Sequence, residues 1–258
     1  MLKKITISVL LCAIIVYSIC CTAVFFFPNK EKYTNANSYL LNTNWQQMGG
    51  FQNCTPDSLR TGCWSTALAQ IAFYHKLQPK GKSSYTSRKG FIINRVLDSV
   101  TFNLNNFTAT IDTATPTEIK KQMALYNFYA ACAVQKDFGT DRYMNKLAPS
   151  SLFEQHYAVS CSRYLSWKNF GPYTLGKLEQ IIYTEITNKR PVFLHFSNLK
   201  NFGHSVVVDG FYYKDGSMFV HTNQGQGGSD DGWYEFKKGI IKADDNALRV
   251  IYTFKPTN

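Results

Sequence analysis

The spacing of apolar residues changes from helical to extended near Arg190, and this change limits the fold more than any other feature of the chain. Before Arg190, apolar residues recur with helical spacing in four segments, at residues 63–78, 115–133, 151–159 and 175–187. After it, short apolar runs alternate with turn residues and predict strands at 191–196, 204–213, 217–222, 233–236 and 248–254. Helices first and a meander of strands last predict an α+β fold with an antiparallel sheet.

Local signals place the ends of some of these elements. Thr115-Pro116-Thr117-Glu118 has the order of a cap, a first-turn proline and a capping-box glutamate, and Ser151 to Glu154 repeats the capping box. Lys214-Asp215-Gly216 predicts a tight turn that joins two strands into a hairpin. No repeat or low-complexity linker divides the chain, so we expect one domain after the N-terminal region.

The N-terminal region indicates export. Residues 5–27 carry no charge and follow Lys3 and Lys4. A basic start before an apolar stretch is typical of a secretion signal, and this stretch is also long enough to span a bilayer. We therefore expect a cleaved signal peptide or an uncleaved membrane anchor over 1–27, a short linker over 28–44, and a domain over 45–258 that is secreted or membrane-anchored outside the cytoplasm.

Charge and cysteine content narrow the class of protein. The net charge is +11, but no block of five like charges occurs, so we expect no nucleic-acid partner. Outside the apolar segment four cysteines remain, at positions 54, 63, 132 and 161, enough for two disulfides in three connectivities, or for one if a thiol is catalytic. The five histidines show no metal-ligand spacing and no glycine pattern indicates a nucleotide, so we expect neither metal nor cofactor.

Cys63 and His204 are the candidate reactive pair. Cys63 begins a predicted helix, where backbone N–H groups and the helix dipole favour the thiolate. His204 begins a predicted strand, and an imidazole can take the proton of a cysteine nucleophile and return it to the leaving amine. Taken singly, Cys63 is more readily interpreted as a buried or disulfide-bonded cysteine, and His204 equally well as a core histidine.

The remaining parts of a Cys/His site have several candidates. Asp209 lies five residues beyond His204 on the same strand, on the opposite face and about 16 Å away, so it does not reach the ring. The hairpin turn returns Asn223 towards His204, and its amide is the predicted partner of the ring N–H. Either Gln46 or Gln47 can supply a side-chain donor to an oxyanion, beside the backbone N–H of Cys63.

Two long blocks of the sequence resemble the streptopain family of papain-like cysteine peptidases. Residues 62–75, GCWSTALAQIAFYH, followed by Pro79-Lys80-Gly81, are similar to the family's nucleophile segment G-C-x-A-T-A-x-A-Q-I-x-x-Y with P-x-x-G. Residues 203–210, GHSVVVDG, and 223–234 are similar to its G-H-A-x-V-x-D-G and N-W-G-W-G-G-x-x-D-G segments, and Trp45-x-Gln47 matches its W-x-Q loop.

The resemblance implies a papain-like fold, with a helical lobe that carries the cysteine and a sheet lobe that carries the histidine. It implies Cys63 as nucleophile, His204 as general base and acid, Gln47 as oxyanion donor and Asn223 as the His204 partner. The expected activity is hydrolysis of peptide bonds in a polypeptide substrate through a thioester on Cys63.

The chain also departs from the family pattern. Gln224 and Gln226 replace the tryptophans that follow the asparagine, so we expect a wetter, weaker contact between His204 and Asn223. The segment between the apolar stretch and Trp45 is short, so we expect no inhibitory prodomain of the kind that the family carries. These departures keep two alternatives open: a catalytically weak binding protein, and an amide or acyl transferase that uses the same Cys/His pair.

Overall fold

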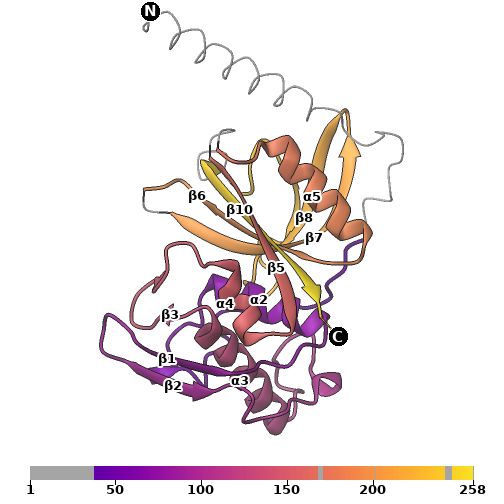
Figure 1. Ribbon diagram of the computed structural model, residues 1–258. Coiled ribbons are helices and arrows are strands. Elements are labelled where there is room, and N and C mark those ends of the chain that lie inside the picture. The colour runs from indigo at the N-terminus through magenta and orange to yellow at the C-terminus, as the bar shows by residue number, and fades with distance from the viewer. Residues whose placement is uncertain (1–37, 168–170, 201, 242–245, 258) are drawn as a thin grey trace, which may run out of the picture.

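A computed structural model describes residues 38–167, 171–200, 202–241 and 246–257 (Figure 1). Its helices are α2 (Cys63–Tyr74), α3 (Thr117–Ala133), α4 (Ser150–His156) and α5 (Leu175–Thr187), with short 3-10 turns at Pro56–Ser58 and Leu104–Asn106. Helices α2, α3 and α4 gather in the lower half of Figure 1, whereas α5 lies in the upper half along the large sheet. The prediction of a mixed fold with helices and antiparallel sheets is confirmed.

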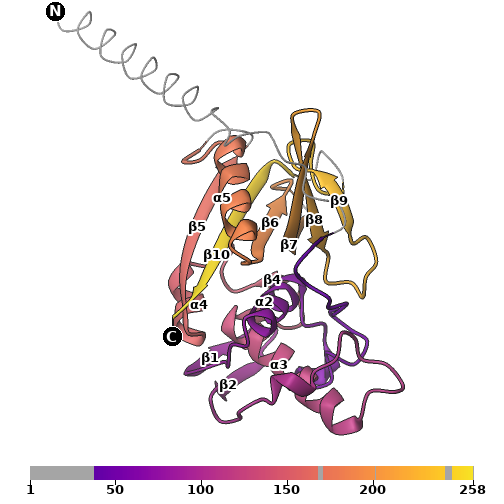
Figure 2. The same cartoon turned by 90° about the vertical axis from the view of Figure 1, so that its right-hand side faces the viewer.

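Six antiparallel strands form the large sheet, in the order β5-β10-β6-β7-β8-β9 (Figure 2). Their bounds are β5 (Val159–Trp167), β6 (Val192–Ser197), β7 (Gly203–Lys214), β8 (Ser217–Asn223), β9 (Gly232–Glu235) and β10 (Leu248–Pro256). The Asp215-Gly216 turn joins β7 to β8 as predicted, since both residues have positive φ. Two small hairpins, β1 (Lys82–Thr86) with β2 (Ile92–Val96) and β3 (Lys136–Asp137) with β4 (Arg142–Tyr143), lie outside this sheet.

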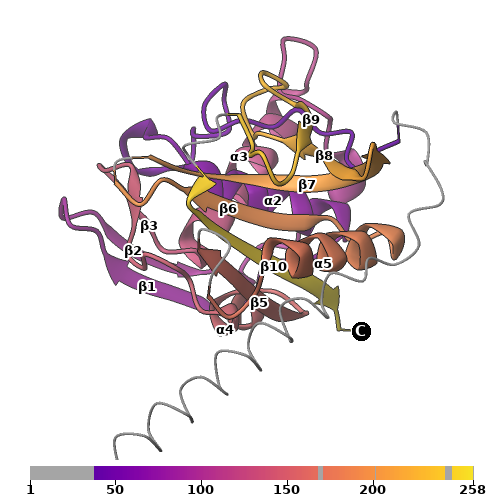
Figure 3. The same ribbon diagram turned by 90° about the horizontal axis from the view of Figure 1, so that it is seen from above.

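The sheet separates two apolar clusters because side chains of a strand alternate between its faces. Phe193 and Val207, opposite each other on β6 and β7, pack in the cluster that contains α2. Leu194 and Val206, one position along, pack in the cluster that contains α5. Helices α2 and α5 therefore cover opposite faces of the sheet, as Figure 3 shows.

Some predicted element ends differ from the structure. Thr115 does not cap α3: the residue before the helix is Pro116, and the Thr115 hydroxyl bonds to the Asp112 carboxylate instead. The helix predicted over 151–159 ends at His156, because Val159 already begins β5, a strand that the sequence did not indicate. Helix α5 has the predicted bounds, and the Thr174 side chain accepts from the Lys177 N–H at its start.

The predicted signal peptide or anchor over 1–27 lies outside the described residues. Within the parts of the chain that are described, no helix is both long and apolar enough to span a membrane. Cys54, Cys63, Cys132 and Cys161 are all free thiols, so the described residues hold none of the disulfides that the cysteine count allowed.

Candidate active site

Cys63 is the first residue of α2, and its position depends on the glycine before it. Gly62 has φ 90°, a conformation that side chains rarely tolerate, and a Cβ there would collide with the Tyr143 hydroxyl. That hydroxyl accepts from the Trp64 N–H at 2.8 Å, which ties the start of the helix to β4. The thiol thus lies at a helix N-terminus whose first turn is held by a hydrogen bond from Trp64 to a residue outside the helix.

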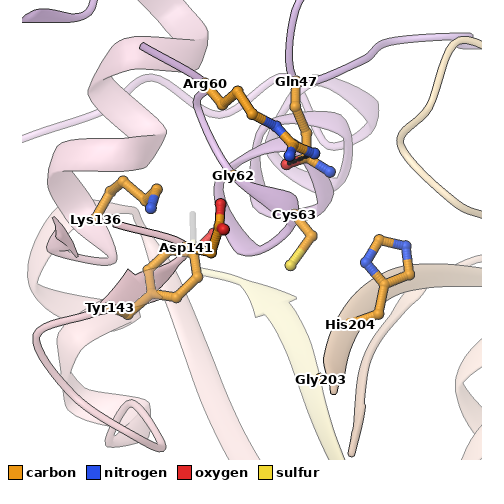
Figure 4. A pocket seen from close by; sticks show the side chains of 9 residues that line it. All are labelled: Gln47, Arg60, Gly62, Cys63, Lys136, Asp141, Tyr143, Gly203 and His204. Atoms are coloured by element: carbon orange, nitrogen blue, oxygen red, sulfur yellow. Dashed lines mark hydrogen bonds between the residues drawn. The ribbon is translucent and has the colours of Figure 1, made fainter. Parts of the chain in front are cut away.

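His204 faces this thiol from the start of β7. Figure 4 shows the imidazole opposite the Cys63 sulfur, across the mouth of a pocket. The ring Nε2 lies 3.1 Å from the Gln224 carbonyl oxygen. A carbonyl oxygen only accepts, so Nε2 carries a hydrogen and donates a hydrogen bond to that oxygen. This leaves Nδ1 as the nitrogen that exchanges a proton with Cys63.

The two groups shift each other's pKa in opposite directions. Burial raises the pKa of Cys63, but hydrogen bonding to His204, the positive charge of that ring and contacts from Ser205 lower it, and the net shift is downward. Burial lowers the pKa of His204, but the bond to Cys63, its charge and the Gln224 carbonyl raise it, and the net shift is upward. Such shifts favour a thiolate–imidazolium pair.

A cavity of about 180 Å³ opens beside this pair. Its lining residues come from the loop before α2, from the β3–β4 hairpin and from β7: Gln47, Arg60, Gly62, Cys63, Lys136, Asp141, Tyr143, Gly203 and His204. The Arg60 guanidinium donates to the Gln47 Oε1 at 3.3 Å, which leaves the Gln47 amide nitrogen free to donate into the pocket. Gln46 instead packs its side chain against Gly49 and Gly227.

Asn223 makes no hydrogen bond to His204, contrary to the prediction. It pairs with Val207, which lies three residues along β7 from His204. Its Oδ1 accepts from Gln70 Nε2 at 2.9 Å and from the Gly225 N–H at 3.0 Å, and its Nδ2 donates to the Thr43 carbonyl. The main-chain carbonyl of Gln224, not a side-chain amide, orients the imidazole.

The surroundings of Gln224 contradict the expectation that the hydrogen bond of His204 is more exposed to water. Its side chain is fully buried, His204 is only 7% exposed, and the Gln224 amide donates to the Thr222 hydroxyl at 2.6 Å. The Gln224 N–H in turn donates to Asp231 at 2.6 Å, which holds the carbonyl's peptide in place. The bond between His204 and Gln224 is therefore shielded from solvent although no tryptophan covers it.

Asp209 is absent from the site, as its strand position predicted. Its carboxylate bonds to His221 Nδ1 at 2.6 Å and accepts from the Leu41 N–H at 3.0 Å. Sequence reasoning missed Arg60, Tyr143 and Ser205, which reach the site from a loop, a small hairpin and β7. Only Ser205 had a signal, since it follows His204 directly.

A thiol of lowered pKa at a helix N-terminus, paired with a strand histidine beside an open pocket, is an arrangement found in enzymes that use a cysteine nucleophile. The family model described as the peptidase C10 family matches residues 45–234. The chain belongs to this family of cysteine peptidases, as the resemblance to streptopain indicated.

Individual relatives agree with this assignment. Streptopain of Streptococcus pyogenes serotype M1 is 27% identical over 197 residues, which cover 72% of this chain and 48% of that protein, and the serotype M28 protein is 26% identical over the same length. The chain thus spans about half the length of the curated relatives it matches. Active interpain A of Prevotella intermedia, a cysteine protease, has a similar fold, with a TM-score of 0.69, 21% identity and coverage of 87% of this chain and 97% of the other.

Proposed function

We propose that this protein is a papain-like cysteine endopeptidase that hydrolyses peptide bonds through a thioester on Cys63. The observation that carries the proposal is the pairing of Cys63 with His204 at the pocket, with the pKa of the thiol lowered and that of the imidazole raised. In the papain-like description, α2 belongs to a helical lobe and β7 to a sheet lobe, and the substrate lies between them.

The two residues divide the chemistry between a nucleophile and a proton carrier. The Cys63 thiolate attacks the scissile carbonyl carbon, and the carbonyl π electrons move to the oxygen. When the tetrahedral species collapses, His204 Nδ1 gives its proton to the leaving nitrogen, the C–N bond breaks and a thioester remains. His204 then takes a proton from water as that water attacks the thioester, and the thiolate leaves.

Two donors are available for the oxyanion that forms in each half of this reaction. The backbone N–H of Cys63 has no partner within the helix because it lies in the first turn. The Gln47 amide supplies the second donor, and its bond to Arg60 through Oε1 turns its nitrogen towards the pocket.

The proposed pair gives a bell-shaped dependence of kcat/KM on pH. Activity rises as the pH increases through the lowered pKa of Cys63, because the thiolate becomes the major form. It falls as the pH increases through the raised pKa of His204, because the proton needed by the leaving nitrogen is lost. We place this activity outside the cytoplasm, because the apolar segment at 5–27 has the features of an export signal or anchor.

Selective alkylation tests the nucleophile directly. The full chain is treated with a substoichiometric iodoacetamide probe near pH 6.5, and the adduct is located by mass spectrometry. Burial raises the pKa of the Cys54, Cys132 and Cys161 thiols, so Cys63 is expected to react first. Cys63→Ala is expected to lose this adduct, and His204→Ala to slow its formation more than tenfold.

Turnover of fluorescent casein then tests hydrolysis. Release of peptides by the full chain, absent in Cys63→Ala, supports the endopeptidase. A reactive Cys63 that acylates but passes the acyl group to an added amine instead of water indicates a transferase. Equal labelling of Cys54, Cys63, Cys132 and Cys161 would overturn the proposed mechanism.

A further inference from the structure

A positively charged side chain with unused hydrogen-bond donors lines the pocket beside Cys63. Arg60 is exposed, lies three residues before the nucleophile and donates one hydrogen bond, at 3.3 Å, to the neutral Gln47 amide (Figure 4). We propose that the Arg60 guanidinium binds a carboxylate of the substrate, so that the enzyme favours peptides with an acidic side chain next to the scissile bond. The inference deepens the proposed peptidase activity and rests on it.

The Arg60 guanidinium has more donors than the protein uses. It carries five N–H groups, and the bond to Gln47 Oε1 takes one of them. Within the described ranges, no carboxylate lies within ion-pair distance of Arg60. The planar, forked guanidinium matches a carboxylate through two parallel hydrogen bonds, and such charge-assisted bonds are stronger than a bond to a neutral amide. A substrate carboxylate is therefore a better acceptor for Arg60 than the one that the fold supplies.

The other long cation of the pocket, Lys136, is already engaged by the protein. This residue is only 3% exposed. Its ammonium donates to the carbonyls of Thr140, of Asp137 at 3.4 Å and of Arg142 at 3.0 Å. An ammonium has three N–H groups, so these three acceptors account for all of them. Among the arginine and lysine side chains of the pocket lining, Arg60 is therefore the one with donors left for a ligand.

One carboxylate, that of Asp141, also lines the pocket and opposes an acidic ligand. Its charge acts on Lys136: burial lowers the pKa of that ammonium, and among the charges that raise it Asp141 has the largest effect. The Arg60 charge acts on the reactive pair, because burial and Arg60 together lower the pKa of His204, against the opposing effects of Cys63. Lys136 and Asp141 thus offset each other, and the positive charge of Arg60 remains beside the reactive pair.

The size of the cavity limits the ligand to a short group. Its volume is about 180 Å³, so it holds one side chain of an extended substrate and not several. The net charge of +11 also attracts acidic polypeptides, but that long-range attraction is the same wherever the acidic residue lies in a short peptide. A preference that depends on the position of the acidic residue therefore separates binding at Arg60 from general attraction.

Quenched fluorescent peptides measure this preference with the full chain. All peptides have amidated C-termini, and glutamate is compared with glutamine at each of the two positions on either side of the scissile bond. At one of these positions kcat/KM is expected to be about fivefold higher for glutamate, the size of an ion pair that keeps some contact with water. Arg60→Ala slows all peptides through Gln47, but the ratio of glutamate to glutamine falls to unity. In Arg60→Glu the ratio inverts.

Two other variants control for charge. Arg95 is an exposed arginine on β2, outside the pocket, with its guanidinium 5.7 Å from the centroid of the Phe128 ring. Arg95→Ala changes the net charge as much as Arg60→Ala does and should leave the ratio of glutamate to glutamine unchanged. Asp141→Asn removes the carboxylate that opposes an acidic ligand and should raise this ratio.

Two alkylating reagents test the carboxylate site without turnover. Iodoacetate and iodoacetamide alkylate the Cys63 thiolate by the same reaction, but only iodoacetate carries a carboxylate. The ratio of the two rates cancels any change in the fraction of thiolate, so a difference in this ratio between variants reports on binding of the carboxylate. The ratio of iodoacetate to iodoacetamide should fall about fivefold in Arg60→Ala and stay the same in Arg95→Ala.

The two measurements together decide the result. The proposal is overturned if glutamate gives no advantage at any position, if the advantage survives Arg60→Ala, or if lysine is preferred to glutamine where glutamate is not. If no peptide is cleaved at all, the proposed function fails and the reagents still decide: a rate ratio that depends on Arg60 supports the carboxylate site, and a ratio that does not depend on it overturns the site as well.

Discussion

Asn223→Ala distinguishes a structural role of this residue from a role in catalysis. In the structure the Asn223 amide makes three hydrogen bonds, to Gln70, Gly225 and Thr43, and none to His204. Two of them join Asn223 to α2 and to the segment before it, and the third, from the Gly225 N–H, is local to the loop after β8. The substitution therefore removes contacts that hold parts of the fold together and leaves the imidazole untouched.

The expected loss of stability follows from these contacts. A buried hydrogen bond contributes about 1 kcal/mol, so three lost bonds reduce the free energy of unfolding by about 3 kcal/mol. For a domain of this size each kcal/mol lowers Tm by roughly 2–4 °C, which gives a decrease of about 6–12 °C. The Gln224 carbonyl remains held through its own N–H by Asp231, so the pKa of His204 should not change.

Urea denaturation followed by tryptophan fluorescence measures the first quantity, and the pH dependence of Cys63 alkylation measures the second. A lower midpoint with an unchanged slope indicates lost stability. Asn127→Ala is a matched control, since Asn127 is a buried asparagine whose amide donates one hydrogen bond, to the Met123 carbonyl, and its loss should lower the free energy of unfolding by about 1 kcal/mol or less. A small loss of stability together with a shifted alkylation profile would refute the structural role and restore Asn223 as the partner of His204.

Three further substitutions test other parts of the site and core. Arg60→Ala removes a charge that lowers the pKa of His204, so the basic limb of the kcat/KM profile should move to higher pH. Gly62→Ala places a side chain against the Tyr143 hydroxyl at a residue with positive φ. It should slow alkylation of Cys63 at least tenfold and lower the free energy of unfolding, measured by denaturant titration, by about 1–3 kcal/mol. Phe153→Ala leaves a cavity at a fully buried position and should lower the free energy of unfolding by about 3–5 kcal/mol, with little effect on the pH profile of alkylation. A large shift of that profile would contradict the assignment of Phe153 to the core.

The strongly periodic elements were predictable from the sequence, and the rest was not. Helix α5 has both an apolar face and a threonine cap, and its bounds match the prediction residue for residue. Strand β5 was missed because its alternation breaks after Ser162, where Arg163 is also exposed, and because the buried position 166 is a polar serine. Its partner is β10, about ninety positions away, and local sequence carries no signal for such a pairing.

In the site, too, the reactive side chains were predictable from the sequence, whereas the main-chain contact was not. Cys63 and His204 were identifiable as candidates because their residue types carry the chemistry, whereas Gln47 was chosen over Gln46 through its match to the family's W-x-Q loop. The Gln224 carbonyl was not, since every residue has one and only the strand register selects it. That register also explains the error for Asn223, because the hairpin returns Asn223 only as far as Val207, three residues short of His204.

The position of β10 in the sheet also sets the order in which the site can assemble. This strand comes last among those that the structure describes, yet it lies between β5 and β6 and pairs with both. The β6–β7 hairpin that carries His204 is synthesised well before β10, and so it is joined to β5 only after β10 has been made. A nascent chain that still lacks residues 248–256 therefore cannot complete the sheet behind the imidazole. Synthesis itself thus delays assembly of the reactive pair until residues 248–256 have been made.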